Sequence, residues 1–222
     1  MMKRQIMKTE DGSFTLFVPD MDEHYHSIHG AKQESMHVFI DAGFNVHSGT
    51  ELTIFEVGFG TGLNAFLTAI ESQRHQRKVA YYAVDKFPLQ EDEWKALIQG
   101  NEANDKEKLL FSQLHSCPWE TSVDITDFFR LHKIEADLTQ LDFAQLPLFD
   151  LIYFDAFAPD KQPQLWTPEI FYSIYNQMAH DSILVTYSAK GAVRRTMQSA
   201  GFQVERIPGP PGKREMLRGR KH

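Results

Sequence analysis

Three glycines, Gly58, Gly60 and Gly62, stand at alternate positions directly after the apolar, β-branched residues 53–57. Residues 63–70, which follow them, have the composition of a helix. Glycine is needed where the chain turns with positive φ and where a ligand approaches the backbone without meeting a Cβ. A strand, a loop of this kind and a helix N-terminus present backbone N–H groups to a bound ligand. The stretch therefore predicts a nucleotide-type binding loop.

The spacing of the glycines narrows the class of ligand. A dinucleotide-binding loop has the spacing G-x-G-x-x-G, whereas the third glycine here comes one residue earlier and Leu63 follows it. The spacing G-x-G-x-G is usual in methyltransferases that use S-adenosylmethionine, where no pyrophosphate has to be accommodated. The loop therefore favours S-adenosylmethionine over a dinucleotide.

An acid ends the next predicted strand. Residues 79–84 form an apolar run that ends at Asp85. An acid roughly 20 positions after the glycine loop can accept hydrogen bonds from both ribose hydroxyls. The alternative is that Asp85 caps a helix that starts near Pro88. A cap alone would not explain the ordered series of strand, glycine loop, helix, strand and acid, so we expect the ribose role.

A second candidate motif follows the predicted buried strand 149–155. It is similar to the Asp/Asn-Pro-Pro-aromatic signature of enzymes that methylate exocyclic amines on bases. A carboxylate can hold the N–H groups of an amine, an aromatic ring can pack against a base, and a proline stiffens the loop. The alternative role for the acid is a helix cap or a loop anchor. The motif reads Asp155-Ala156-Phe157-Ala158-Pro159.

Methylation of an amine requires the neutral nitrogen lone pair. An alkylammonium titrates near ~10, as lysine does, so neutralising it at pH 7 costs about 4 kcal/mol. A carboxylate in line with the amine can orient it and stabilise the charged product. An unperturbed carboxylate is a weak base for an ammonium. We therefore expect Asp155 to act chiefly by orientation and electrostatics.

The predicted elements that position these residues alternate between strands and helices, which indicates a mostly parallel sheet covered on both faces. In such a sheet the ligand binds outside the carboxyl ends of the strands, where Gly58, Asp85, Asp137 and Asp155 are each expected. The predicted fold class is α/β, a Rossmann-like class I methyltransferase fold that binds S-adenosylmethionine. Its sheet is expected to be mostly parallel and seven-stranded, with a terminal antiparallel hairpin. The further expected elements are a hairpin over 4–18, helices over 31–42, 88–114, 168–179 and 190–200, strands over 122–126, 129–134 and 182–187, and a hairpin over 202–219.

Length and composition limit the number of domains and the cellular compartment. We expect an N-terminal hairpin and helix appendage over residues 1–45 and the methyltransferase domain over residues 46–222. The chain has no run of about 18 apolar residues and no apolar leader, so we expect a cytoplasmic protein. Cys117 is the single cysteine, which excludes an internal disulfide and favours a packing role. The histidines, among them His24, His26 and His29, lack the spaced partner pair of a zinc site, so no metal is expected.

The charge of the chain is unevenly distributed. The net charge is −7, yet residues 190–222 contain nine lysines and arginines against two glutamates. Phosphate binding depends on a local basic face and not on the total charge. Two interpretations stay open: a face for nucleic acid, or a solvated basic tail.

The whole pattern resembles the methyltransferase domain of the bifunctional tRNA wobble-uridine enzyme family MnmC, in stand-alone form. The resemblance covers about residues 22–219, in order. Its matching stretches are Asp22-Glu23-His24-Tyr25-His26-Ser27 with Gly30 and Glu34-Ser35; the glycine loop from Glu56 to Asn64; Asp85-Lys86-Phe87-Pro88-Leu89; Asp155 to Pro159; Leu165-Trp166-Thr167; Thr186-Tyr187-Ser188-Ala189 with Val193-Arg194-Arg195; and Ala200-Gly201-Phe202 with Gly212-Lys213-Arg214-Glu215-Met216-Leu217.

The resemblance implies that the chain methylates 5-aminomethyl-2-thiouridine at the wobble position of tRNA, with S-adenosylmethionine as the methyl donor. It implies that Asp155 is the catalytic residue that faces the amine. The residues implied to bind the cofactor are Glu56, Gly58, Gly60, Gly62, Asn64, Asp85, Lys86, Asp137 and Leu138. Those implied to bind the substrate are Tyr25, Ser27, Glu34, Phe157, Pro159, Trp166, Tyr187, Lys213 and Arg214. Packing remains the alternative for Trp166 and Tyr187, and organisation of the last hairpin remains the alternative for Lys213 and Arg214.

We expect no counterpart of the FAD-dependent oxidase domain of the fused enzymes in these 222 residues, since they contain no second glycine-rich loop. We therefore expect the chain to act after a separate wobble-uridine modification enzyme, with a monomer as the default state. One alternative is a methyltransferase or aminopropyltransferase for a small amine such as a polyamine. The excess of acidic residues outside residues 190–222 would suit such a cationic substrate. Another is a module that binds S-adenosylmethionine or RNA without turnover.

Overall fold

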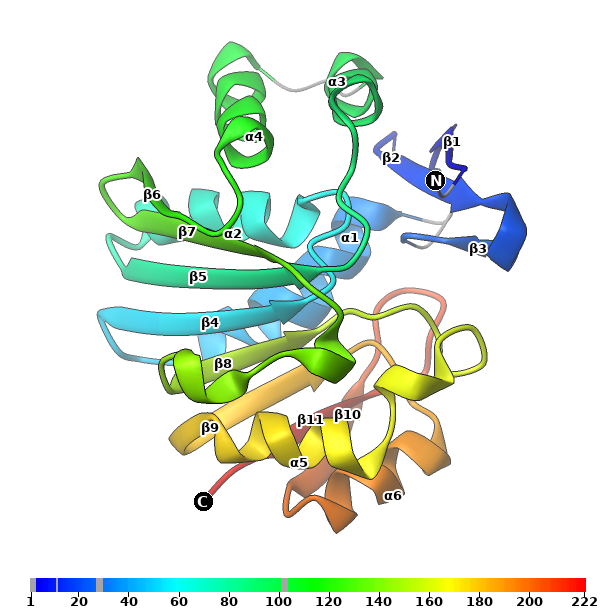
Figure 1. Cartoon of the computed structure of the whole chain (residues 1–222), viewed down its shortest axis with the longest axis vertical. Helices are drawn as coiled ribbons and strands as arrows, with labels where there is room; N and C mark the ends of the chain where they lie inside the picture. Colours follow the sequence, from blue (N-terminus) through cyan, green and yellow to red (C-terminus); the bar gives the residue numbers. More distant parts are fainter. Residues whose placement is uncertain (1–2, 11, 27–29, 101–103) are drawn as a thin grey trace.

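The computed structural model describes residues 3–10, 12–26, 30–100 and 104–222. Ser27 and His29, two residues singled out from the sequence, lie outside the described residues. The described chain forms a large central sheet with helices on both faces and a smaller N-terminal sheet beside it (Figure 1).

The central sheet has eight strands in the order β10-β11-β9-β8-β4-β5-β7-β6 among the described residues. Five neighbouring strands are parallel, from β9 to β7, and the remaining pairings are antiparallel. The predicted α/β class is thereby confirmed. The sheet exceeds the expected seven strands because β6 pairs antiparallel with β7 at its edge. The strands are β4 (Glu51–Val57), β5 (Lys78–Asp85), β6 (Ser122–Thr126), β7 (Phe129–Glu135), β8 (Phe149–Phe154), β9 (Met178–Thr186), β10 (Gln203–Pro208) and β11 (Glu215–Arg220).

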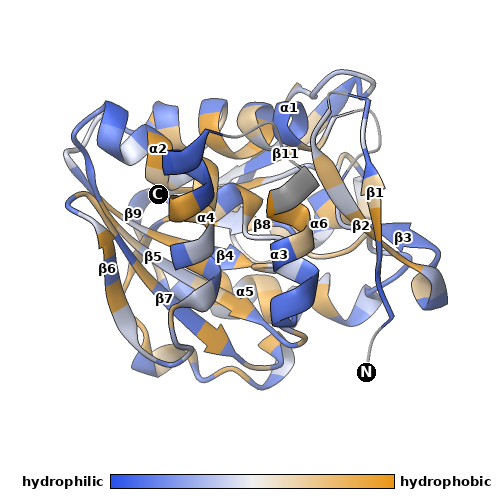
Figure 2. Ribbon diagram, turned by 90° about the horizontal axis from the view of Figure 1, so that it is seen from above, coloured by the Kyte–Doolittle hydropathy of each residue, from blue (hydrophilic) through white to orange (hydrophobic). Residues whose placement is uncertain are grey.

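Alternation along the central strands divides the core between the two faces of the sheet. Ile54 and Tyr153 pack in one buried cluster, while their neighbours Phe55 and Ile152 pack in the other. Successive side chains of a strand point to opposite faces, so nearly continuous apolar strands require a cover on both sides. The helices supply it: α2 (Leu63–Arg74) and α4 (Asp105–Ser116) cover one face, and α5 (Pro168–Asn176) and α6 (Gly191–Ser199) cover the other. Figure 2 shows both hydrophilic and hydrophobic turns in α2, as expected for a covering helix.

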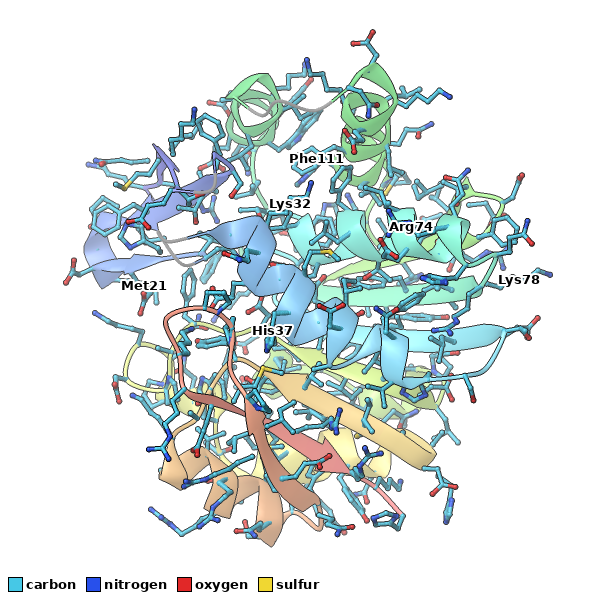
Figure 3. The ribbon with its side chains drawn as sticks, turned by 180° about the vertical axis from the view of Figure 1, so that it is seen from behind. Met21, Lys32, His37, Arg74, Lys78 and Phe111 are labelled. Carbon is cyan, nitrogen blue, oxygen red and sulfur yellow. The ribbon has the colours of Figure 1, made fainter. Side chains whose placement is uncertain are left out.

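The helix expected over 31–42 is split into α1 (Ala31–Ser35) and a π-helical segment, Met36–Asp41. Val38, Phe39 and Ile40 of that segment are buried in the same cluster as the central strands. Part of the expected appendage therefore belongs to the core of the larger unit. Figure 3, seen from behind, shows these turns crossing the sheet, with His37 close to the last hairpin.

The N-terminal sheet contains the expected hairpin, β1 (Gln5–Lys8) and β2 (Phe14–Val18), and a short third strand, β3 (Glu23–His24), that was not predicted. The N-terminal sheet contacts α3 (Glu91–Gly100) through β1 and β2. Figure 1 shows it beyond the carboxyl ends of the parallel strands, next to α1. The small sheet is therefore positioned at the edge where a ligand is expected.

Two boundaries differ from the prediction for physical reasons. The helix expected over 168–179 ends at Asn176, because β9 begins at Met178. The helical stretch expected over 88–114 is two helices, and the second begins with a capping box between Asn104 and Glu107.

We expect Gly43→Ala to lower the free energy of unfolding by about 1–3 kcal/mol through overpacking. Gly43 ends the turn after the π-helical segment, and a Cβ there would lie 2.5 Å from the carbonyl oxygen of Phe39 and 3.2 Å from the Tyr153 ring. Urea denaturation measures the change. The control is Gly49→Ala, where the nearest atom to an added Cβ is 3.4 Å away. Equal stabilities of the two variants would contradict this packing account.

Candidate active site

The glycine loop between β4 and α2 has the backbone conformation that its sequence predicts. Gly58, Gly60 and Gly62 have φ values of 89°, 52° and 72°, all in the left-handed region. A Cβ on Gly58 would lie 2.9 Å from the carbonyl oxygen of Asp155. Both the turn and the close approach of the neighbouring strand therefore require glycine.

Asp85 stands at the carboxyl end of β5 and holds the glycine loop. Its Oδ2 accepts a hydrogen bond from the Gly60 amide at 2.8 Å, and its Oδ1 accepts one from the Phe87 amide at 2.8 Å. Burial raises the pKa of this carboxyl, while the two amides act in the opposite direction. Each carboxylate oxygen has a further lone pair that can accept a ligand hydroxyl.

A cavity of about 900 Å³, called here the first cavity, opens at the carboxyl ends of the parallel strands. Residues that contribute to it but were missed in the sequence include Phe87, Gln162 and Gln164. The only sequence signal for the two glutamines was their position shortly after the Asp155 motif. Of the predicted site residues, the cavity brings together Tyr25, Gly58, Gly60, Asn64, Asp85, Lys86, Asp137, Leu138, Asp155 and Phe157.

Asp137 and Lys86 form an ion pair at the outer side of the first cavity. Lys86 Nζ lies 2.7 Å from Asp137 Oδ2, and Thr139 donates from both its amide and its hydroxyl to Oδ1. These hydrogen bonds, that of Lys86 first, lower the pKa of Asp137 to about 2. Asp137 is therefore an anionic acceptor at neutral pH.

At the wall of the first cavity, one amide group links a fully buried carboxyl group and a partly buried one. Asn64 Nδ2, in the first turn of α2, donates to Glu56 Oε1 at 2.9 Å and to Asp155 Oδ2 at 2.8 Å. Glu56 is fully buried in β4 and does not line the first cavity. Its effect on a ligand therefore passes through Asn64.

Both carboxyl groups of this network are strongly perturbed. Burial raises the pKa of Glu56 well above its usual range, and the nearby Asp155 carboxyl adds to the increase. Burial likewise raises the pKa of Asp155, and Glu34 adds to it, while Asn64 and Lys213 act against it. Perturbed carboxyl groups beside a cavity mark candidate functional sites.

A second cavity of about 850 Å³ lies on the other side of Asp155. It shares Tyr25, His26, Asp155, Ala156 and Phe157 with the first cavity. Tyr25 and Phe157 meet edge to face, with ring centroids 4.9 Å apart. Asp155 therefore stands between two spaces that could each hold a ligand.

Tyr25 is held by a residue that the sequence reading did not single out. Arg4 Nε donates to the Tyr25 hydroxyl at 2.9 Å, and the same guanidinium pairs with Glu93 of α3 and with the carbonyl oxygen of Phe87. The Tyr25 ring packs on the glycine loop, since a Cβ on Gly60 would lie 3.0 Å from its Cδ1. The N-terminal sheet is thus tied to the first cavity.

The remaining predicted residues occupy different places. Trp166 is 6% exposed and its Nε1 donates to the carbonyl oxygen of Phe157, so it supports the Asp155 loop by packing. The Tyr187 hydroxyl donates to the carbonyl oxygen of Ala156 and its ring lines the second cavity. Gly62 packs against His115. Glu34 and Lys213 line the second cavity, while Pro159 and Arg214 line an outer groove next to it.

The expected cofactor, S-adenosylmethionine, fits the residues of the first cavity. The floor of the cavity is glycine backbone, and its sides carry Asp85 and Asp137 as acceptors for hydroxyl or amine groups. Asn64 Oδ1, in the wall of this cavity, is a buried oxygen without a hydrogen-bond partner among the described residues, which suits a cationic neighbour.

The described part of the chain offers no group of three or more histidines, cysteines, aspartates or glutamates that could hold a metal ion. Over the same residues, every helix is too short or too polar to traverse a lipid bilayer.

We expect Glu56→Gln to make stability less dependent on pH. In the wild type the folded carboxyl has the higher pKa, so the native state binds more protons than the unfolded state above about pH 4, and stability falls as pH rises. The fall is about 1.4 kcal/mol per pH unit until the folded carboxyl ionises. The stability gain of the variant should therefore grow from pH 4 upward, as urea denaturation can measure. The control is Glu51→Gln, at an exposed position of the same strand. A gain that stays constant between pH 4 and 8 would contradict the raised pKa of Glu56.

Comparison with known proteins points to the same cofactor. Residues 113–222 match a family described as S-adenosyl-L-methionine-dependent methyltransferase. The chain is 30% identical over 220 residues to the tRNA 5-methylaminomethyl-2-thiouridine biosynthesis bifunctional protein MnmC of Paraburkholderia phymatum, an alignment that covers 93% of this chain and 33% of that protein. The protein of the same name from Pseudoalteromonas atlantica is 30% identical over 237 residues, which covers 96% and 34%.

The chain thus spans about one third of the length of these relatives. Among solved structures, MNMC2 from Aquifex aeolicus superimposes with a TM-score of 0.78 at 22% identity, over 99% of this chain and 70% of that one. This likeness establishes the fold. Taken with the first cavity, the comparisons make S-adenosylmethionine the cofactor. Residues 113–222 of the chain thus match the S-adenosyl-L-methionine-dependent methyltransferase family, and most of its length is similar to one third of the MnmC proteins.

Proposed function

We propose that the chain transfers a methyl group from S-adenosylmethionine to the primary amine of 5-aminomethyl-(2-thio)uridine at the wobble position of tRNA, giving 5-methylaminomethyl-(2-thio)uridine. The names of its relatives, which refer to the biosynthesis of that nucleoside, support this substrate. A separate enzyme would supply the aminomethyl group. The observation that carries the proposal is Asp155, a partly buried carboxyl between one cavity suited to the methyl donor and another suited to an amine.

The first cavity would hold the cofactor. Asp85 would accept the ribose hydroxyls, Asp137 and Leu138 would lie beside the adenine, and the glycine loop would approach the ligand with its backbone. Lys86 would keep Asp137 ionised through their ion pair. When bound, S-adenosylmethionine supplies an electrophilic methyl group on a sulfonium sulfur. The buried Asp155 and Asn64 oxygens would favour that positive charge over neutral surroundings.

Asp155 would hold the amine in line with the methyl donor. Its Oδ2 already accepts the Asn64 amide, so we assign Oδ1 to the amine nitrogen. The raised pKa of Asp155 makes this carboxylate a stronger base than an exposed one, which favours transfer of a proton from the ammonium. Phe157 would pack against the base, and Trp166 would fix Phe157 through the hydrogen bond to its carbonyl oxygen.

We also propose that, of the appendage expected over residues 1–45, the N-terminal sheet closes the site of the catalytic unit over residues 46–222. The hydrogen bonds of Arg4 with Tyr25 and Glu93 support this role. A second tie is the hydrogen bond from Lys161 Nζ, in the loop after Asp155, to the carbonyl oxygen of Met21 at 2.8 Å.

A small cationic amine is the second candidate substrate, and one observation favours it. More than half of the basic side chains of residues 190–222 form ion pairs with acids, which reduces the number that could instead contact phosphates. The pairs are Lys190 with Asp160, Arg206 with Glu215, Lys213 with Glu34, and Arg218 and Arg220 with Glu205.

The salt dependence of binding separates the two candidates. Binding of tRNA should weaken steeply with salt because each contacted phosphate releases counterions, with a slope of about −0.7 to −0.9 per phosphate. Fluorescence titration of labelled tRNA between about 50 and 200 mM salt measures the slope of log K against log[salt]. A slope smaller than about one in magnitude, with turnover of a polyamine, would favour the small-amine candidate.

We expect Asp155→Asn to reduce methyl transfer by about 10²-fold or more, because an amide orients the amine but cannot take its proton. Affinity for S-adenosylhomocysteine should change only a few-fold, because the side-chain oxygen of the variant asparagine can still accept the hydrogen bond from Asn64 Nδ2. Mass spectrometry of the wobble nucleoside gives the rate, and calorimetry gives the affinity. Asp124→Asn, at the exposed far edge of the sheet, is the matched control and should behave as the wild type. Full activity of the Asp155 variant would remove this carboxyl from the mechanism.

A further inference from the structure

Lys213 places an ammonium group inside the second cavity. Its Nζ lies 2.6 Å from Glu34 Oε1 and 4.6 Å from the centroid of the Tyr187 ring. The Glu34 side chain is 13% exposed and that of Lys213 is 40% exposed. The lysine therefore reaches from a half-exposed position on the last hairpin to a carboxylate at the wall of the cavity.

A carboxylate combined with an aromatic face is the set of groups that recognises an alkylammonium. The carboxylate forms a charge-assisted hydrogen bond, and the negative face of the ring attracts the cation. The aminomethyl group of the proposed substrate ends in the same CH2–NH3+ unit as a lysine side chain. Lys213 thus occupies a site with the chemistry that the substrate amine requires.

The charges that line the second cavity favour a cationic ligand. Glu23, Glu34 and Asp155 line it, and Lys213 is the single lysine or arginine among its described lining residues. If Lys213 left, the carboxylates would face the cavity without that cation. Another ammonium group would then be attracted to the same place.

The Lys213 side chain also has a second space within its reach, the outer groove. It lines both the second cavity and the outer groove, where Lys190 and Arg214 accompany it. The hairpin loop that carries it contains Gly212, whose surroundings are open. An anion in the outer groove would meet the basic side chains there and compete with Glu34 for the Lys213 ammonium, because a partly exposed ion pair exchanges readily.

We propose that Glu34 and Tyr187 complete, together with Asp155 in the wall of the same cavity, the binding site for the primary ammonium of the substrate, and that Lys213 fills the Glu34 and Tyr187 part of this site in the free protein. A phosphate of the RNA in the outer groove draws Lys213 away and opens the site. This inference rests on the proposed function, and it makes the enzyme selective for an amine carried by RNA over a free nucleoside.

The test compares two substrates in Lys213→Met: free 5-aminomethyluridine and tRNA that carries the same base. Removing the internal ammonium should raise kcat/KM for the nucleoside about tenfold, as when a site blocked nine-tenths of the time becomes free. The same variant should lower kcat/KM for tRNA, because the partner of the phosphate is lost. Opposite changes for the two substrates are the expected result.

Three further variants frame this test. Glu34→Gln should lower kcat/KM for both substrates, because it removes the carboxylate that receives either ammonium. Lys213→Arg keeps the charge and should not raise the rate with the nucleoside. Arg220→Met removes a paired charge from the same hairpin, whose partner Glu205 lines neither cavity nor the outer groove, and should leave both rates unchanged. Thermal melting of each variant confirms that it is folded.

A fall or no change in nucleoside methylation by Lys213→Met would overturn the inference. If the wild type methylates neither substrate, the proposed function fails, and the site is then tested by binding alone. Calorimetric titration of 5-aminomethyluridine in the presence of S-adenosylhomocysteine should show tighter binding to Lys213→Met than to the wild type. Equal or weaker binding would overturn the inference independently of turnover.

Discussion

One side-chain amide organises the centre of this molecule. Asn64 donates both protons of its Nδ2 group to carboxyl groups from two different strands, Glu56 in β4 and Asp155 after β8. Two buried carboxyl groups repel each other when both are ionised, and an uncompensated buried charge is costly. The amide links them and fixes the direction of Asp155. The position of the candidate catalytic group thus depends on a residue of the glycine-loop helix.

The glycine loop and the catalytic strip are therefore one unit and not two neighbouring motifs. Gly58 packs on the backbone of Asp155, and Asp85 accepts the amide of Gly60. A change at any of these residues shifts both cavities together, because the interior of a protein is close-packed. Through this coupling, one edge of the sheet would hold a methyl donor and the proposed amine in a fixed relation.

The sequence predicted what depends on local patterns. The spacing of the glycines, the acid at the end of β5 and the Asp155 motif indicated the α/β fold and the edge of the sheet that carries the site. Contacts between distant segments left no such signal. The Arg4–Tyr25 bond and the Lys213–Glu34 pair join residues far apart in the sequence, and neither lies in a recognisable spacing. Glu56 was expected at the ligand, yet it lies behind Asn64, because a strand pattern does not tell which buried residue reaches the cavity wall.

The most direct measurement is a crystal structure with S-adenosylhomocysteine and 5-aminomethyl-2-thiouridine bound together. The account predicts that the amine nitrogen lies within hydrogen-bond distance of Asp155 Oδ1, about 2.7–3.2 Å, and faces the sulfur of the cofactor product from the second cavity. An amine bound elsewhere, or a cofactor product outside the first cavity, would contradict it.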